Sequence, residues 1–262
     1  MRGDGRYPCP VSPTTPPPAS GTREIDTAVV DTAPSDTAPS DTAVVDTALV
    51  DAYPPFGLRI SAGDLTLRPL RDADLPAYTA LLRRPVFADM SSDQVFPWYD
   101  MDPEQRVSSA VQFQWHLRSK VRPEGWAISF GIFLGEQLIG MQDLIASHFA
   151  VRGVVSSGSW LTLDQQGKGH GKLMRQAVLV LAFDHLSARR AETSAVVSNG
   201  PSCGVSRACG YREDGLEVIE ENGRAKTIQR FSLTPEQFRR PRAEVGVEGL
   251  TDALRARLGA QG

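Results

Sequence analysis

The stretch "SWLTLDQQGKGHGKLM" (residues 159–174) holds the main clue to fold and function in this 262-residue chain. Gly167, Gly169 and Gly171 alternate with Lys168 and His170, after an apolar run and before a helical pattern. A glycine-rich turn that enters a helix directs unpaired amides and the helix dipole at one spot. Glycine also permits positive φ and a close backbone approach. The stretch therefore indicates an anion site, although such a turn can also be only a turn.

Two common phosphate motifs do not fit this loop. A Walker loop requires a glycine at position 166 and a hydroxyl residue at position 173, where the chain has Gln166 and Leu173. A dinucleotide fingerprint requires a third glycine where Lys172 stands, and it opens the first βα unit of a parallel sheet. Several predicted strands precede this loop, so neither motif applies.

The remaining chain predicts an α+β layout. Hydrophobic periodicity, caps and turn residues predict first a strand at 65–71, a helix from Asp72 to residue 84, a loop at 85–100 and a helix after the Asp102-Pro103 cap. The later elements are a hairpin at 126–134 and 138–146, a strand at 156–163, a helix to His185, a strand at 191–198, a helix at 201–210 and two strands within 211–233. Antiparallel strands followed by β-α-β-α-β indicate a mixed sheet.

The N-terminal residues have a composition that is typical of disorder. Asp recurs every fifth residue at 26, 31, 36, 41, 46 and 51, after a proline-rich stretch. Little apolar surface is available to offset the entropy of ordering. We expect a disordered acidic leader at 1–55, one folded domain at 56–240 and a C-terminal extension at 241–262.

Composition excludes several classes of protein. Without residues 1–52, the chain has 25 Lys and Arg against 23 Asp and Glu, which does not favour a nucleic-acid binder. No apolar run has the length of a membrane span, and no signal-peptide pattern is present. Cys9, Cys203 and Cys209 have no metal-ligand spacing. We expect a cytoplasmic protein that binds no metal, nucleic acid or membrane; a homo-oligomer is compatible with the sequence.

Three elements in order resemble the GCN5-related N-acetyltransferase (GNAT) superfamily. They are Gln166-x-x-Gly169-x-Gly171 after a strand, "NGPSCGVSRACGY" at 199–211, and "LTLRPLRDADL" at 65–75. The last two resemble the branch of the ribosomal-protein N-terminal acetyltransferases. The resemblance covers about 65–234 and implies a mixed, mostly antiparallel sheet with a splayed central pair of strands flanked by helices. "SGSWL", "FPWYD" and "GYREDGL" further resemble a bacterial succinyl-CoA-binding subgroup.

The resemblance implies a donor site for succinyl-CoA or acetyl-CoA. Leu161 and Leu163 would contact the pantetheine arm through their backbone, Asn199 would hydrogen-bond it, and Ser202 would return a proton to sulfur. The pyrophosphate would bind the amides of Gln166, Gly167, Lys168, Gly169, His170, Gly171 and Lys172. By residue type alone, Leu161 and Leu163 are also core residues and Asn199 is also a helix cap. Ser202 is also a first-turn residue, the lysines are also solvated charges, and an acyl-cysteine route through Cys203 or Cys209 is a minor alternative.

The general base is not given by the resemblance. The branch often carries a glutamate on the strand before the loop, where this chain has Ser157. A base must lie within hydrogen-bond reach of the proton, directly or through a water. Asp143, His148 and Glu192 are candidates by placement, and a water relayed by Ser157 is another.

The acceptor is less defined. Trp98 and Tyr99 fall where the family shapes its acceptor pocket, and their alternative role is core packing. Arg118, Lys120 and Arg122 could meet a succinyl carboxylate, or form a solvated charge run. The acceptor is expected to be a small amine or hydrazine, or a protein lysine or N-terminus. The alternative from another class is a CoA-binding sensor or scaffold that has kept the fold and lost the base.

Overall fold

The alternating apolar pattern after Asp64 forms a strand in the computed structural model, which describes residues 47–87, 101–221 and 223–260. Leu65 and Leu67 point into the core, while Thr66 and Arg68 are partly exposed. The described residues belong to one compact unit, Asp46–Gly262. Its sheet has nine strands in the order β7-β8-β6-β5-β4-β3-β2-β1-β9. Their bounds are β1 (Arg59–Ala62), β2 (Leu65–Pro69), β3 (Gly125–Leu134), β4 (Gln137–Ser147), β5 (Val154–Leu161), β6 (Arg190–Val196), β7 (Arg212–Glu221), β8 (Arg224–Leu233) and β9 (Val245–Glu248).

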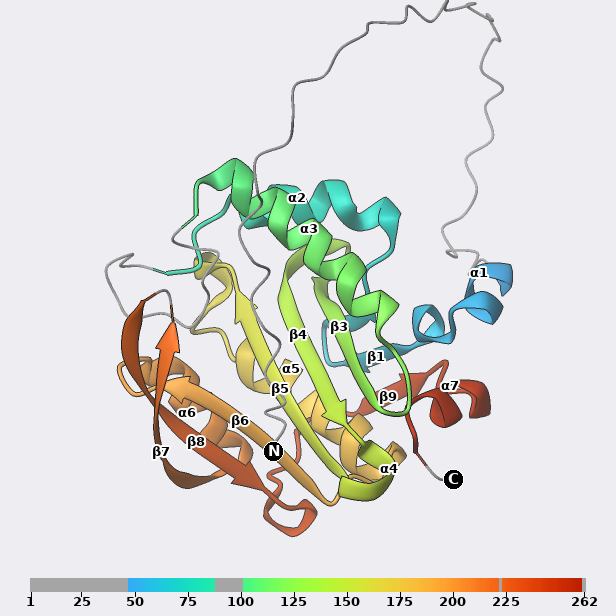
Figure 1. Ribbon diagram of the computed structural model, residues 1–262. Coiled ribbons are helices and arrows are strands. Elements are labelled where there is room, and N and C mark those ends of the chain that lie inside the picture. The colour runs from blue at the N-terminus through green and yellow to red at the C-terminus, as the bar shows by residue number, and fades with distance from the viewer. Residues whose placement is uncertain (1–46, 88–100, 222, 261–262) are drawn as a thin grey trace, which may run out of the picture. The chain divides into compact units, whose positions relative to one another are not determined.

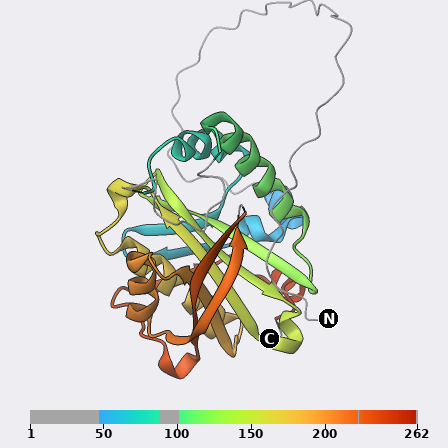
Figure 2. The ribbon, with the colours of Figure 1, turned by 60° about the vertical axis from the view of Figure 1, so that its left-hand side comes forward.

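One strand pair is parallel and every other pair in this sheet is antiparallel. β5 and β6 are the parallel pair, joined by a helical crossover. The β7–β8 hairpin continues the sheet beyond β6 and is strongly twisted (Figure 2). The predicted α+β class and the mixed, mostly antiparallel sheet are confirmed.

Helices cover both faces of the sheet (Figure 1). α2 and α3 pack on β3 and β4, whereas α5 and α6 pack on the opposite face. The helices are α1 (Thr47–Ala52), α2 (Leu75–Leu82), α3 (Pro103–Ser119), α4 (Phe149–Arg152), α5 (His170–Val180), α6 (Gly200–Cys209) and α7 (Asp252–Arg257). Shorter turns are η1 (Pro54–Gly57), η2 (Asp72–Asp74), η4 (Leu163–Gln165), the π-helical η5 (Leu181–His185) and η6 (Pro235–Gln237).

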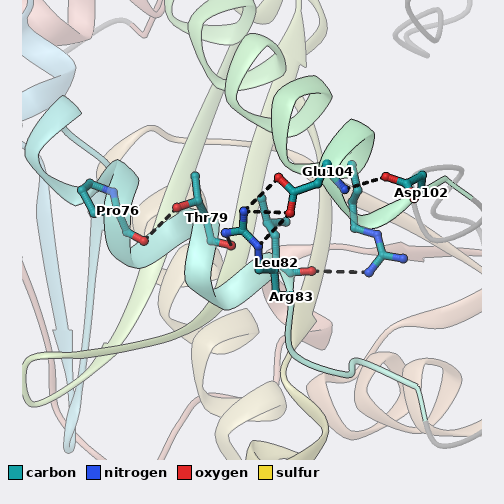
Figure 3. A network of polar contacts seen from close by, with 7 residues as sticks. Pro76, Thr79, Leu82, Arg83, Asp102 and Glu104 are labelled. Carbon is teal, nitrogen blue, oxygen red and sulfur yellow. Dashed lines mark hydrogen bonds and ion pairs between the residues drawn. The ribbon is translucent and has the colours of Figure 1, made fainter.

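Polar contacts join the end of α2 to the start of α3, on either side of residues 88–100 (Figure 3). Arg83 donates to both carboxylate oxygens of Glu104, at 3.1 Å each. Both side chains are largely exposed, so this ion pair contributes at most about 1 kcal/mol. The contacts link the end of α2 to the start of α3.

Helix caps follow the sequence in one case and differ in another. Asp102 caps α3 as predicted, because its carboxylate accepts from the amide of Glu104 at 3.0 Å. Asp72 was predicted to cap the first helix, and the structure differs. Asp74 holds the turn before α2 instead, because its carboxylate accepts from the Arg71 backbone amide and the Arg68 guanidinium at 2.7 Å each. The ion pair between Arg68, on β2, and Asp74 therefore stabilises this turn.

The folded part begins earlier than the predicted boundary at residue 56. The last residues of the expected leader form α1 and η1, and Pro54 and Pro55 are buried. Tyr53 and Phe56 also pack edge to face, with their ring centroids 4.8 Å apart. The acidic repeat indicated disorder up to this point, but the residues that follow it are anchored in the domain by the buried prolines.

The C-terminal residues complete the sheet and the core. β9 pairs with β1 in antiparallel register, from Arg59 opposite Glu248 to Ala62 opposite Val245. Leu254 and Leu258 are fully buried in the large core on the α5 side. The indole of Trp126, on β3, donates to the Leu258 carbonyl oxygen at 2.8 Å. The described part of the predicted extension, residues 241–260, is therefore structurally part of the domain.

We predict that Leu258→Ala lowers the free energy of unfolding by about 2–5 kcal/mol, because it leaves a cavity where a fully buried side chain was. Urea denaturation followed by circular dichroism measures this change. The exposed neighbour Arg257→Ala is the control and should stay within about 0.5 kcal/mol of wild type. Equal stability of the two variants would show that the C-terminal helix does not hold the core.

Candidate functional site

The central strands β5 and β6 separate after three residues. They pair from Val154 opposite Arg190 to Ser156 opposite Glu192, and then they diverge (Figure 1). Each strand keeps its other neighbour, because β5 pairs with β4 and β6 pairs with β8. The inner backbone edge of β5 from Ser157 to Leu161 therefore has no ladder partner among the described strands. An extended ligand could hydrogen-bond along this edge.

A side chain closes the narrow end of this gap. The Thr193 hydroxyl, on β6, donates to the Ser157 carbonyl oxygen at 2.9 Å. This bond lies one residue beyond the last backbone pair, so it marks the vertex of the splay. The wide end lies at the carboxyl ends of both strands, because parallel strands end at the same side of a sheet.

The glycine loop lies at this wide end. Gly167 (φ 73°) and Gly169 (φ 89°) take left-handed backbone conformations, and Gly169 caps α5 without a side-chain bond. Gly171 does not have a positive φ, and an added Cβ would only touch Val205 and Leu161. In the described chain, the amides of residues 167–171 have no backbone acceptor. They are available to an anion, whereas the amides of Gln166 and Lys172, which were also predicted to bind it, already donate to the carbonyl oxygens of Leu163 and Gly169.

The side chains around the loop have distinct roles. The Gln166 side chain supports the loop, because its NH₂ group donates to the carbonyl oxygens of Val86 (2.7 Å) and Leu161 (2.9 Å). Lys168 and Lys172 are exposed, and His170 starts α5. Leu161 ends β5 and is buried.

Leu163 differs from the prediction of a strand contact. It lies in η4, beyond the end of β5, and its amide already donates to the Pro85 carbonyl oxygen at 2.8 Å. The apolar alternation continues past the point where the backbone turns, so the pattern predicted a strand that ends two residues later than β5 does.

The start of α6 lies at the same wide end of the splay. Asn199 caps α6, since its side-chain oxygen accepts from the Ser202 amide at 3.1 Å. The cap uses the oxygen of this side chain and leaves its NH₂ group for another partner. Ser202 follows in the first turn of the helix. α6 packs against α5 and β6, which brings both helix N-termini to one end of the gap.

The predicted catalytic residues do not form one cluster. Asp143 and Gly158 are opposite each other on β4 and β5, and Ser157 is opposite Leu144. Because side chains alternate along a strand, Asp143 and Ser157 point to opposite faces of the sheet. Asp143 faces α3, where Gln114 donates to Ser129 at 3.3 Å beside it. Ser202 lies apart from both, on α6.

Burial raises the pKa of Asp143 to about 6, against a smaller opposing effect of a hydrogen bond from Ser129. Its Oδ1 atom is buried without a hydrogen-bond partner in the described chain, although the residue as a whole is partly exposed. An added Cβ at the opposing Gly158 would meet nothing within 4 Å. The buried carboxyl group therefore lies next to a position that the described residues leave open, beside the free edge of β5.

The other candidate bases and cations are placed less favourably. His148 is exposed beyond the end of β4, in a left-handed conformation. Glu192 is paired with Arg190 at 3.0 Å. Arg118 is held by Asp72 and by the Leu70 carbonyl oxygen, and Lys120 and Arg122 are exposed. Trp98 and Tyr99 lie outside the described residues.

Sequence reasoning missed one polar cluster on the α5 face of the splay. Arg175 is 3% exposed and hydrogen-bonds side chains on three successive strands: Gln142 on β4, Ser159 on β5 and Thr193 on β6. The signal was an arginine inside a run of buried residues, since α5 is buried from Met174 to Val180.

The family follows from a direct comparison. Residues 64–212 match the family model described as "Acetyltransferase (GNAT) domain", which is more than half of the chain. The chain therefore belongs to the GNAT acetyltransferase family, whose members act on acyl-CoA donors and amine acceptors. The helices of the described residues include none that is long and apolar enough to cross a membrane. No group of three or more His, Cys, Asp or Glu that could hold a metal ion is found in the same residues.

Solved structures share the fold. Mycobacterium smegmatis RimJ in complex with CoA-disulfide has a TM-score of 0.58 and 20% identity, over 78% of this chain and 93% of that one. RimL, a ribosomal L7/L12 alpha-N-protein acetyltransferase in complex with coenzyme A, has a TM-score of 0.54 and 21% identity, over 65% and 93%. Spermidine N-acetyltransferase from Vibrio cholerae, with CoA and spermine, has a TM-score of 0.52 and 20% identity, over 66% and 97%.

We predict that Gly169→Val raises the Kd for coenzyme A at least tenfold, or about 1.4 kcal/mol. Valine is strained at a φ of 89°, so the loop amides would turn away from the phosphate. Isothermal titration calorimetry measures Kd. Gly135→Val is the matched control, since Gly135 also has a positive φ and open space but lies in the β3–β4 turn. A folded Gly169→Val protein with the wild-type Kd would contradict the anion site.

Proposed function

We propose that the protein moves a succinyl or acetyl group from coenzyme A to an amine or hydrazine nitrogen, within a ternary complex. The observation that carries this proposal is the unpaired edge of β5, between the glycine loop at one end and the Thr193 bond at the other. A pantetheine arm paired with this edge would place its thioester near the vertex, while the loop amides bind the pyrophosphate. Membership of the GNAT family supports the reaction class.

The donor site in this proposal uses three elements. The Leu161 backbone and the free NH₂ group of Asn199 bind the pantetheine arm, and the amides of residues 167–171 bind the pyrophosphate. An amide of the free β5 edge polarises the thioester carbonyl, as in an oxyanion hole. The Ser202 hydroxyl donates a proton to the departing thiolate.

The acceptor approaches from the α3 face, where Asp143 lies beside the free edge. Its carboxylate accepts a proton from the acceptor's ammonium group, and the free amine then attacks the thioester carbonyl. Ser157 faces the other side of the sheet and takes no part in this proton path. RimL is a ribosomal-protein acetyltransferase and the Vibrio cholerae protein is a spermidine acetyltransferase, which supports an amine acceptor of either size. Trp98 and Tyr99 remain the predicted walls of this pocket.

We predict that kcat/KM rises with pH through an apparent pKa of about 6, because the base form of Asp143 is the carboxylate and burial raises its pKa to that value. At pH 7.5, Asp143→Asn should lower kcat at least 100-fold and remove this limb of the profile. Steady-state rates between pH 5 and 9 measure both effects.

The control for this prediction is Glu192→Gln. Glu192 is a partly exposed carboxylate near the vertex, but it is already paired with Arg190. This variant should keep the wild-type pH profile. An Asp143→Asn enzyme with an unchanged limb near pH 6 would exclude Asp143 as the base.

The donor and the activity itself are tested together. We predict that kcat/KM for succinyl-CoA exceeds that for acetyl-CoA at least tenfold with one amine, since a charge-assisted hydrogen bond contributes roughly 1.5–3 kcal/mol. Mass spectrometry of the protein with each donor and an amine library measures the acylated products. Faster acetyl transfer would make acetyl-CoA the donor. CoA binding without any acyl product would instead indicate a sensor or scaffold.

A further inference from the structure

Arg175 is a buried cation without a carboxylate partner in the part of the chain that the structure describes. Its hydrogen bonds go to three neutral groups: the side-chain oxygens of Gln142 (3.4 Å), Thr193 (3.2 Å) and Ser159 (2.9 Å). A guanidinium group stays protonated in proteins, so it cannot avoid this burial by losing its charge. Buried arginines are almost always paired, because removing an ion from water costs several kcal/mol.

The groups around Arg175 have hydrogen-bonding capacity left over. Three of the five N–H donors of the guanidinium are used by the bonds above, and the Tyr211 hydroxyl is a further hydrogen-bonding neighbour of this group. The hydroxyls of Ser157 and Tyr211 are both buried, and neither has a partner at full hydrogen-bonding geometry within the described residues. Both lie in the same cluster, since Arg175 and Ser157 are the polar neighbours of the Tyr211 hydroxyl. One positive charge with two buried hydroxyls beside it matches the needs of a carboxylate.

The cluster lies at the vertex of the splay. Thr193 accepts from Arg175 and also donates to the Ser157 carbonyl oxygen, where the gap closes. Ser159 lies two residues further along the free edge and remains partly exposed. A donor that enters from the glycine loop and follows β5 toward Ser157 would bring its acyl group to this place.

We propose that the Arg175 cluster (Gln142, Ser157, Ser159, Arg175, Thr193 and Tyr211) binds a carboxylate at the free end of the donor's acyl group. This inference rests on the proposed function and names its donor class: CoA thioesters of dicarboxylic acids, such as succinyl-CoA. The anion compensates the buried charge, and the hydroxyls complete its hydrogen bonds. The cluster thereby explains why a cation occupies a buried position on α5.

Binding measured without an acceptor tests this site. Succinyl-CoA and butyryl-CoA carry acyl chains of equal length, with and without the carboxylate. Calorimetry on the wild type should give at least tenfold tighter binding of succinyl-CoA, and Arg175→Met should reduce this ratio to about one. Arg175→Lys keeps the charge but loses the planar fork, so its ratio should fall between the two.

Gln176→Met is the matched control on the same helix. Gln176 is also 3% exposed, but it donates to the Arg239 carbonyl oxygen, outside the cluster. This variant should keep the wild-type ratio. If Arg175→Met does not fold, Tyr211→Phe removes one hydroxyl with little change of shape and should lower the ratio at least threefold.

Two results would overturn the site: a wild-type ratio near one, or equal weakening of both thioesters by Arg175→Met, which would make Arg175 a structural brace. The proposed function fails separately. Discrimination between the two thioesters without any acyl product would leave the carboxylate site standing and exclude the transferase. Acetyl transfer without discrimination between the two thioesters would leave the transferase standing and exclude the carboxylate site.

Discussion

The candidate site depends on how short the parallel pairing between β5 and β6 is. Three residue pairs join the strands, and the Thr193 hydroxyl then takes the place of the next backbone bond. A longer ladder would occupy the edge of β5 that the donor needs, and a shorter one would leave the centre of the sheet unsupported. The two helix N-termini at the open end follow from the same pair, because both strands run in one direction.

The sheet separates two groups of opposite charge near this edge. The Arg175 cluster lies on the α5 face, and Asp143 lies on the α3 face, one strand away. Since each charge is buried, each acts in a medium that screens it less than water does. In the proposed reaction the donor's anionic end and the acceptor's cationic nitrogen are therefore attracted from opposite sides of one layer. The thioester carbonyl lies between them.

Local signals in the sequence were sufficient for much of this fold. The Asp102-Pro103 cap, the β3–β4 hairpin and the glycine loop each depend on residues close together in the chain, and each was predicted correctly. β1 and β9 have only four residues each, too few for a periodic signal; β1 is a strand because it pairs with β2 and β9, and β9 because it pairs with β1. The Arg175 cluster was missed for a related reason. Its members are spread from Gln142 to Tyr211, and only the folded chain brings them together.

The pairing of β1 with β9 has a consequence during synthesis. These strands come from opposite ends of the domain. The Trp126 indole, on β3, likewise has its acceptor, the Leu258 carbonyl oxygen, near the C-terminal end. A nascent chain that emerges N-terminus first thus exposes the outer edge of β1 until the last residues have left the ribosome. Unpaired edges are sites of aggregation in partly folded chains. Early termination before Val245 would therefore release a protein whose sheet ends at β1 and whose core lacks Leu254 and Leu258.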